Sequence, residues 1–297
     1  MDLSIIIVNY NTKDFLKKCI KSIVDNVSKK ISYEIIVIDN ASADRIQNSE
    51  FSFILQNQNL QLIFNKKNLG FSKANNIGIR KAQGRYILFL NPDTVMQKNV
   101  IEKMVEFMDN HKDAGAATCK LIMPNGQIDD ACHRGFPTPW NAFCHFSGIS
   151  RLFTKSKLFS GYNLGFKDLN KIHEIDALAG AFMLVRRVAG ENVGWWDEDY
   201  FFYGEDIDFC YMLKQNNWKV YFVPTVSILH YKGVSGGIKN ISKKISTADK
   251  ETKKRVTHAR FNAMRIFYKK HYENKYPKLL TWLVYKAISL KEILAFF

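Results

Sequence analysis

The most constraining feature of this sequence is a regular alternation of short β-branched runs and helical patterns over its first 120 residues. Apolar runs at 3–8, 35–38, 60–64 and 86–90 have the length of strands, and amphipathic segments separate them. Strands that alternate with helices build βαβ units and a parallel sheet. Because ligands of such sheets bind beyond the carboxyl ends of the strands, we predict an α/β fold with its site at that edge.

The rest of the chain contains further predicted elements around a long irregular stretch. Residues 124–173 are rich in Gly, Pro, Phe and His without a clean period, so we expect loops and short helices there. Loops laid over a rigid sheet commonly carry binding residues. The remaining predicted elements are helices at 15–27, 72–82, 99–110, 205 onward, 250–271 and 277–297, and strands at 114–121, 219–223 and 227–231.

Polar residues follow several predicted strands at comparable positions. These residues are Asn9, Tyr10 and Asn11 after the first run, Asp39 after the second, Asn91 and Asp93 after the fourth, and His230 at the end of a late strand. Because parallel strands end at one edge of a sheet, these side chains are expected to form a site. A dinucleotide site would need G-x-G-x-x-G after the first strand, but that turn reads NYNTKD, which largely excludes a dehydrogenase.

Six segments in the same order resemble one enzyme family over about residues 3–237. They read SIIIVNYNT at 4–12, IVIDNAS at 36–42, NKKNLGFSKANNIGI at 65–79, GRYILFLNPDT at 84–94, GAFMLVRR at 180–187 and WDEDYFFYGEDID at 196–208. The sequence thus resembles the family 2 glycosyltransferases and, within them, the rhamnosyltransferase-like branch.

The resemblance implies a fold, an activity and a domain division. The implied fold is GT-A, a mixed and mostly parallel sheet flanked by helices, here with a C-terminal helical extension. Residues 1–237 would form the glycosyltransferase domain, with a nucleotide-binding half (1–120) and an acceptor-binding half (121–237). Residues 238–297 would form a basic lid and an amphipathic helical tail. Enzymes of this kind pass a sugar from a nucleotide-diphospho-sugar to an acceptor hydroxyl.

The resemblance also assigns the donor-binding residues. Asp39 matches the acid that accepts a hydrogen bond from the imide N–H of uracil or thymine, a role that suits a group that only accepts. The other residues implied at the nucleotide are Tyr10, Asn11, Asn68, Gly70, Asn91 and Asp93. For Asn68 and Gly70 a plain turn is an equal alternative, and for Asp39 the alternative is a solvated turn or helix cap.

Asn91-Pro92-Asp93 occupies the position of the family's D-x-D metal motif, but its first acid is Asn. The resemblance implies that Asp93 and His230 hold a divalent cation, Mn²⁺ or Mg²⁺, which would stabilise the charge of the leaving diphosphate. A structural histidine at the strand end is the alternative for His230.

The cluster GEDID at 204–208 carries the candidate catalytic base. An inverting transfer needs a carboxylate that removes the proton of the acceptor hydroxyl, and the resemblance assigns this role to Asp206, with Glu205 as its rival. Helix capping alone is the alternative for these acids. The residues expected to contact the acceptor are Trp195, Trp196, Asp197, Glu198 and Tyr203, although core packing is equally expected for one of the two tryptophans.

The charge of the chain is concentrated at its C-terminal end. Of the net charge of +15, residues 1–231 carry +3 and residues 232–297 carry +12. Apolar residues recur at three- or four-residue intervals from Leu279 to Phe297, which predicts an amphipathic helix. An anionic membrane surface is one expected partner for 239–297, and packing on the domain or self-association is the alternative. No recognition motif accompanies the charge, so nucleic acid is not an expected partner.

The five cysteines include no C-x-x-C pair, so neither a disulfide framework nor a zinc knuckle is expected. No signal peptide and no apolar run long enough to span a bilayer is recognised, so we expect a cytoplasmic protein, with peripheral attachment to the inner face of the cell membrane as a further hypothesis.

The favoured hypothesis is an inverting, metal-dependent enzyme that acts in cell-surface polysaccharide synthesis. The resemblance favours dTDP-rhamnose as its donor, and UDP-hexose, UDP-galactofuranose and UDP-N-acetylhexosamine stay open. The acceptor would be a glycan or a polyprenyl-diphosphate-linked glycan. A non-catalytic nucleotide-sugar-binding or assembly protein is the alternative from another class, because the first metal acid is missing.

Overall fold

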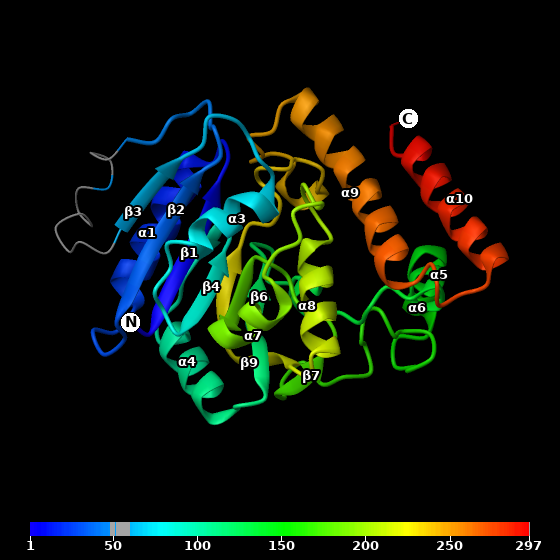
Figure 1. Ribbon diagram of the computed structural model, residues 1–297, viewed down its shortest axis with the longest axis horizontal. Helices are drawn as coiled ribbons and strands as arrows, with labels where there is room; N and C mark the ends of the chain where they lie inside the picture. Colours follow the sequence, from blue (N-terminus) through cyan, green and yellow to red (C-terminus); the bar gives the residue numbers. More distant parts are fainter. Residues whose placement is uncertain (48–50, 52–59, 297) are drawn as a thin grey trace.

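A computed structural model of the chain describes residues 1–47, 51 and 60–296 (Figure 1). Its strands form one nine-stranded sheet in the order β3-β2-β1-β4-β8-β6-β9-β5, with β7 paired to β9. The strands are β1 (Leu3–Asn9), β2 (Tyr33–Asp39), β3 (Leu60–Phe64), β4 (Tyr86–Leu90), β5 (Thr94–Val95), β6 (Ala114–Ile122), β7 (His173–Ile175), β8 (Phe182–Arg186) and β9 (Lys219–His230).

The first four strands are mutually parallel, as the alternation predicts. β1 pairs in parallel with both β2 and β4, and β2 pairs in parallel with β3. β8 then runs antiparallel to β4 and β6, so the sheet as a whole is mixed. The parallel order β3-β2-β1-β4 brings the polar residues that follow β1, β2 and β4 to one edge, which confirms the predicted arrangement of these strands.

The helices are α1 (Lys13–Asn26), α3 (Phe71–Ile79), α4 (Val100–Asn110), α5 (Pro139–Ser147), α6 (Ile149–Leu152), α7 (Arg187–Val193), α8 (Glu205–Gln215), α9 (Lys250–His271) and α10 (Lys278–Leu294). The stretch 124–173 contains loops, the short α5 and α6 and one 3-10 turn, as predicted. In Figure 1, α10 lies at the opposite end of the molecule from β3 and α1, and α9 lies between α10 and the sheet.

One predicted boundary differs from the structure. The two strands expected at 219–223 and 227–231 are one strand, β9, which pairs with β6 along its length. Cys119 pairs with Val223 and the adjacent Lys120 pairs with Ser227, so three residues bulge out and the ladder then resumes. The bulge begins at Pro224, which has no N–H to donate, and this explains why the pattern looked broken in the sequence.

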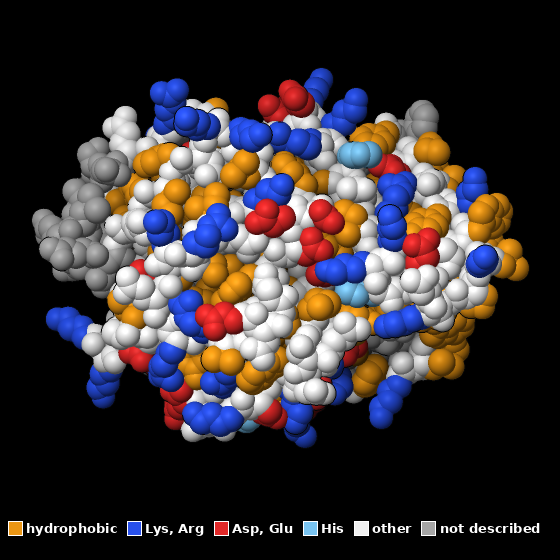
Figure 2. All heavy atoms as spheres, in the orientation of Figure 1, with side chains coloured by type: hydrophobic (Ala, Val, Ile, Leu, Met, Phe, Trp, Pro, Cys, Tyr) orange, Lys and Arg blue, Asp and Glu red, His pale blue; other side chains and the backbone are white. Residues whose placement is uncertain are grey.

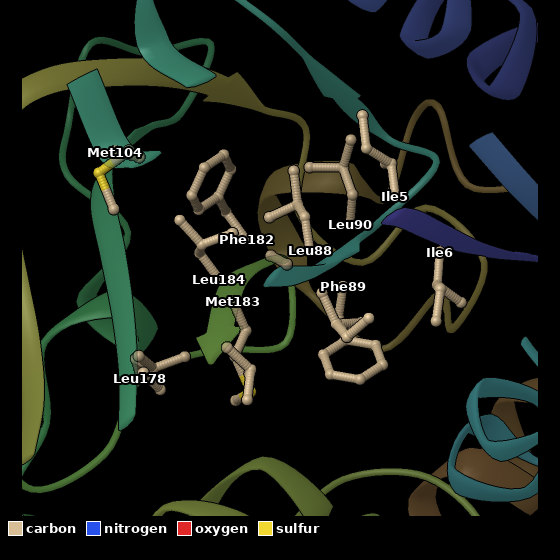
Figure 3. Packing of buried hydrophobic residues seen from close by; sticks show 14 of the residues in the cluster. Ile5, Ile6, Leu88, Phe89, Leu90, Met104, Leu178, Phe182, Met183 and Leu184 are labelled. Atoms are coloured by element: carbon tan, nitrogen blue, oxygen red, sulfur yellow. The ribbon is translucent and has the colours of Figure 1, made fainter. Parts of the chain in front are cut away.

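The core lies between the sheet and its helices. Strands β1, β4 and β8 contribute fully buried side chains, among them Ile5, Leu88, Phe89, Phe182 and Leu184, which pack together in Figure 3. These strands are apolar on both faces because helices or loops cover both sides of the sheet, as expected for its central strands. The resulting rigid platform positions the turns at the carboxyl edge.

The two C-terminal helices differ in burial. α9 buries Phe261, Phe267 and Tyr268, whereas on α10 Ile288 is the buried residue. Glu292 of α10 accepts hydrogen bonds from Arg265 at 2.6 Å and from His258 at 2.7 Å, which joins α10 to α9. Among the described residues, no helix combines the length and the apolar character needed to cross a bilayer.

Candidate functional site

A cleft of about 1340 Å³ opens at the carboxyl edge of the sheet. Its lining comes from the turns after β1, β2 and β4, from residues 201–207 at the start of α8, and from α5, α9 and α10. The predicted site residues that line it are Tyr10, Asn68, Gly70, Asn91, Asp93, Tyr203, Glu205, Asp206 and His230. The fold therefore brings the candidate base and the candidate metal ligands into one cleft.

Asp39 and Asn11 lie at the same edge but are not part of this lining. Asp39 is buried and accepts hydrogen bonds from the side chain of Asn9 at 2.8 Å and from the backbone N–H of Ser42 at 3.1 Å. The side chain of Asn11 accepts a hydrogen bond from the backbone N–H of Ala43 at 2.7 Å. Both side chains thus hold together the turns after β1 and β2. Their contact with the nucleobase of a donor stays a prediction.

Gly70 has a structural reason to be glycine. Its φ is +85°, and a Cβ at this position would lie 2.6 Å from the carbonyl oxygen of Phe201. The same oxygen accepts a hydrogen bond from the backbone N–H of Phe71 at 2.8 Å. The side chain of Asn40 donates to Asn68 at 2.8 Å and supports this turn. Glycine therefore allows the turn before α3 to close against the segment that leads into α8.

Asp93 and His230 lie side by side, and Asp129 joins them. Nε2 of His230 is 3.5 Å from Oδ1 of Asp93, and its Nδ1 is 2.9 Å from Oδ2 of Asp129. Lys232 pairs with the other oxygen of Asp129 at 2.6 Å. Oδ2 of Asp93 accepts hydrogen bonds from the backbone N–H groups of Gly233 and Val234. These bonds fix the carboxylate of Asp93 toward the imidazole.

The acids and the histidine of this cluster shift one another's pKa values toward their charged forms. Burial opposes ionisation of Asp93 and Asp129, but the charge of His230 and the hydrogen bonds outweigh burial and lower the pKa of both carboxyls. Burial likewise opposes protonation of His230, yet the two carboxylates raise its pKa to about 9. The cluster therefore favours a positive charge beside Asp93.

The same residues fit a divalent cation that takes few ligands from the protein. Nε2 of His230 is buried and has no hydrogen-bond partner, and Oδ1 of Asp93 faces it. An imidazole nitrogen beside a carboxylate oxygen suits Mn²⁺ or Mg²⁺ completed by phosphate oxygens. The part of the chain that the structure describes has no group of three or more acid, histidine or cysteine side chains that could hold a metal. The donor set is thus suited to an ion shared with a diphosphate.

Glu205 and Asp206 begin α8 and differ in their surroundings. Asp206 accepts a hydrogen bond at 2.6 Å from Arg134, which also donates to the carbonyl of Leu178. Glu205 is buried, and its Oε2 has no hydrogen-bond partner. Burial, and then the charge of Asp206, raise the pKa of Glu205 to about 8. One carboxylate is paired with an arginine, whereas the other is buried without a cation partner and holds its proton near neutral pH.

The third acid of the cluster faces away from the cleft. Asp208 is buried and accepts hydrogen bonds from His271 at 2.6 Å, Lys270 at 2.9 Å and Tyr200 at 3.2 Å. Because His271 and Lys270 belong to α9, Asp208 attaches α9 to α8.

Four of the five predicted acceptor residues lie outside the cleft lining, and Tyr203 lies within it. Trp196 is buried and packs edge-on against Phe89, with ring centroids 4.7 Å apart, and Trp195 is partly buried in the same core. Asp197 pairs with Lys270 at 2.7 Å, and Glu198 accepts a hydrogen bond from Asn76. These four side chains pack the segment before α8, and contact between them and an acceptor stays a prediction.

Several cleft residues were missed by sequence reasoning. They are Arg134 and Asp129 in the irregular stretch and Lys232, Lys239, Arg255 and Arg260 in the basic segment. Burial, and then the charge of Arg260, lower the pKa of Lys239 to about 8. Arg255 donates to the hydroxyl of Tyr10 at 3.1 Å. The excess of lysine and arginine signalled this segment, but nothing in the sequence signalled Asp129 or Arg134.

Comparisons with known proteins identify the family of the chain. The family model described as glycosyl transferase family 2 matches residues 4–169. The rhamnosyltransferase WbbL of Escherichia coli (strain K12) is 28% identical over 236 residues, covering 76% of this chain and 82% of that protein. The low-salt glycan biosynthesis hexosyltransferase Agl10 of Haloferax volcanii is 26% identical over 239 residues, covering 78% and 68%.

A solved structure shows the same fold. GalNAc-T7, crystallised with UDP, GalNAc and Mn²⁺, superposes with a TM-score of 0.58 at 16% sequence identity, covering 93% of this chain and 58% of that chain. The predicted GT-A fold is therefore confirmed. Because the family model spans more than half of the sequence, the chain belongs to glycosyl transferase family 2.

Proposed function

We propose that this protein is an inverting, metal-dependent glycosyltransferase that moves a sugar from a nucleotide-diphospho-sugar to a hydroxyl of a glycan acceptor. One observation carries the proposal: the carboxylates of Glu205 and Asp206 share a single cleft with the Asp93–His230 pair. The reaction needs a proton acceptor and a means of stabilising a leaving diphosphate in the same place.

Asp93 and His230 would hold the metal ion together with the diphosphate of the donor. When bound, the ion would supply charge stabilisation to the leaving group. The side chains of Lys232, Lys239 and Arg255 line the same cleft and would add positive charge around the diphosphate. These cations help to offset the missing first acid of the metal motif, because part of the stabilisation would come from the protein itself.

Asp206 is the proposed catalytic base, and Glu205 is the alternative. The acceptor hydroxyl oxygen would attack the anomeric carbon, its proton would pass to Asp206, and the nucleoside diphosphate would leave with the electrons of the glycosidic bond. Arg134 fixes the carboxylate of Asp206 in direction. Burial and the charge of Asp206 raise the pKa of Glu205 to about 8, so Glu205 would need to lose its proton before it could act.

Support for the donor class comes from the relatives. GalNAc-T7 was crystallised with UDP, and WbbL carries the name of a rhamnosyltransferase. We therefore propose dTDP-rhamnose as the first donor to test and UDP-hexoses as the second. Asp39 and Tyr10 are the residues proposed to contact the nucleobase of the donor. The name of Agl10 places that relative in glycan biosynthesis, which supports a role in cell-surface polysaccharide synthesis.

The test is binding and turnover of a panel of dTDP- and UDP-sugars with Mn²⁺, Mg²⁺ or EDTA. We expect one donor to raise the melting temperature only with a divalent cation and to release nucleoside diphosphate slowly. Asp93→Asn should abolish the metal-dependent increase, whereas Asp113→Asn, which alters an exposed ion pair with Lys219, should retain it. Release that persists unchanged in EDTA would contradict the metal-dependent mechanism.

A second candidate is a nucleotide-sugar-binding protein without turnover. The observation in its favour is Asn91, which stands at the edge of the cleft where the family motif has its first acid. A binding protein of this kind should bind one donor tightly and release no nucleoside diphosphate with any acceptor.

A further inference from the structure

Two histidine rings that do not line the cleft face each other. Nε2 of His133, which follows the 3-10 turn Asp130–Cys132, lies 2.6 Å from Nε2 of His173, the first residue of β7. The rings stand nearly at right angles, with their centroids 4.8 Å apart. Both pack on the ring of Phe222 in β9, the strand to which β7 is paired. The fold therefore brings together two imidazole nitrogens that are 40 residues apart in the sequence.

The contacts of His173 decide which of its nitrogens carries a hydrogen. Its Nδ1 lies 2.8 Å from the carbonyl oxygen of Lys171, and a carbonyl can only accept. Nδ1 therefore carries the hydrogen in the neutral ring, and Nε2 presents its lone pair to His133. The hydrogen that lies between the two rings then belongs to Nε2 of His133. A histidine that binds a metal ion is usually oriented in the same way as His173, by donation from its other nitrogen to a carbonyl or carboxylate.

Both rings are mostly uncharged around neutral pH, and the uncharged ring is the form that binds a metal ion. Burial, and then the charge of His173, lower the pKa of His133 to about 4. Burial also lowers the pKa of His173, and the hydrogen bond to Lys171 opposes this shift. The charge of Lys167 lowers both pKa values further, whereas Asp168 raises that of His173. The pair thus offers two neutral nitrogen ligands.

The space beside the pair and the charge of the protein restrict the kind of ion. A pocket of about 400 Å³ is lined by His133 together with Asp130 and Asp168, so water can complete the coordination of an ion there. The chain has a net charge of +15, and Figure 2 shows lysine and arginine side chains spread over the visible face. Because this charge does not attract cations, direct bonds to the imidazoles must supply the affinity. Imidazole nitrogen suits Zn²⁺, Cu²⁺ and Ni²⁺, whereas Mg²⁺ and Ca²⁺ prefer oxygen ligands.

We propose that His133 and His173 bind a divalent transition-metal ion such as Zn²⁺, at a site separate from the cleft. The ion would take the place of the hydrogen between the rings, and that hydrogen would pass to Nδ1 of His133 by exchange with water. Zn–N bonds of about 2.0 Å at a tetrahedral angle place the two nitrogens about 3.3 Å apart, so the rings would separate by about 0.7 Å. His173 is only partly buried and lies on a strand of three residues, which allows this movement. Because Arg134 directly follows His133, the ion would also tie β7 to the segment that carries the partner of Asp206.

Calorimetric titration of the full chain with Zn²⁺, without a sugar donor, tests the proposal. We expect saturable binding that His173→Gln weakens by at least about tenfold, because loss of a group that merely orients a metal ligand already costs that much. His111→Gln is the matched control: Nδ1 of His111 also lies near a carbonyl oxygen, that of Phe107 at 2.9 Å, but its ring stacks on Phe107. It should leave the affinity within about twofold of that of the unchanged protein. Zinc held by Asp93 and His230 would persist in both variants, so the number of ions bound separates the two sites.

Electron paramagnetic resonance with Cu²⁺ gives a second readout that needs no variant. The spectrum of the unchanged protein should show coupling of the copper to two imidazole rings, and His173→Gln should reduce this to one. Zinc binding that is unchanged in His173→Gln, or weakened equally in His111→Gln, would overturn the proposal. Absence of zinc binding, or of coupling to two rings, would overturn it as well, since the two histidines would then form a hydrogen-bonded pair only.

Discussion

The two sides of the cleft are built in different ways. On the nucleotide side, the polar residues after β1 and β2 bond to one another, as when Asn9 and Ser42 donate to Asp39. On the side of α8, two of the three acids that begin the helix bond to distant segments, Asp206 to Arg134 and Asp208 to α9. Similar carboxylates therefore acquire different roles because their partners differ.

Position in the sequence predicts the location of a side chain better after a strand than at the start of a helix. Parallel strands end at one edge, so a polar residue after a buried strand has a predictable location. A helix turns its side chains around its axis, so neighbouring acids face different directions and only the surrounding elements decide their protonation and exposure.

The largest expected effect is on catalysis. Asp206→Asn should lower kcat by about 10²- to 10⁴-fold, the usual loss when a general base is removed. Donor affinity should stay close to that of the unchanged protein, because the donor is held elsewhere in the cleft. Steady-state kinetics with the identified donor and acceptor give both values. A larger loss of kcat in Glu205→Gln than in Asp206→Asn would assign the base to Glu205.

The next effect is on stability at the junction of α8 and α9. Asp208→Asn should reduce the free energy of unfolding by about 3 kcal/mol, because it leaves the buried His271 without its carboxylate partner and removes one of the two carboxylates that Lys270 contacts. Urea denaturation measures this value. Asp25→Asn, which removes an exposed ion pair with Lys21, should change stability by less than about 0.5 kcal/mol. Equal changes would mean that Asp208 does not join the two helices.

On the nucleotide side, Gly70→Ala should cost about 2 kcal/mol, because alanine is strained at this positive φ and its Cβ would meet the carbonyl oxygen of Phe201. Gly126→Ala is the matched control: its φ is +79° and no atom lies within 4 Å of the added Cβ. Thermal unfolding of both variants separates the close contact from backbone strain. Equal destabilisation would show that the contact with Phe201 costs nothing.

The smallest expected effect is the pH dependence due to Glu205. Its folded pKa of about 8 lies above the ordinary value of 4.5. The stability linked to this proton is therefore complete below pH 4.5 and is lost as pH rises through 8. Glu205→Gln should remove on the order of 1 kcal/mol of that loss between about pH 7 and about pH 9.

Melting temperatures across that range measure the effect of Glu205→Gln, with the exposed Glu106→Gln as the control. If both variants lose stability with rising pH as steeply as the unchanged protein, Glu205 does not carry the proton.

The sequence alone determined the strands β1 to β4 and the edge at which their polar residues meet. Periodicity and β-branched composition are local properties, and a parallel order then follows from the alternation with helices. Asp93 and His230 are expected at one edge for the same reason, and the family resemblance implied that they act together, which their contact in the structure allows.

Only the tertiary structure decided how the acids at the start of α8 are divided among their partners. Arg134 lies 72 residues before Asp206, and His271 lies 63 residues after Asp208. No local pattern encodes such pairs, because they form when loops and the C-terminal helices pack over the sheet. Tertiary packing also buries Trp196, and partly Trp195, in the core beside Phe89.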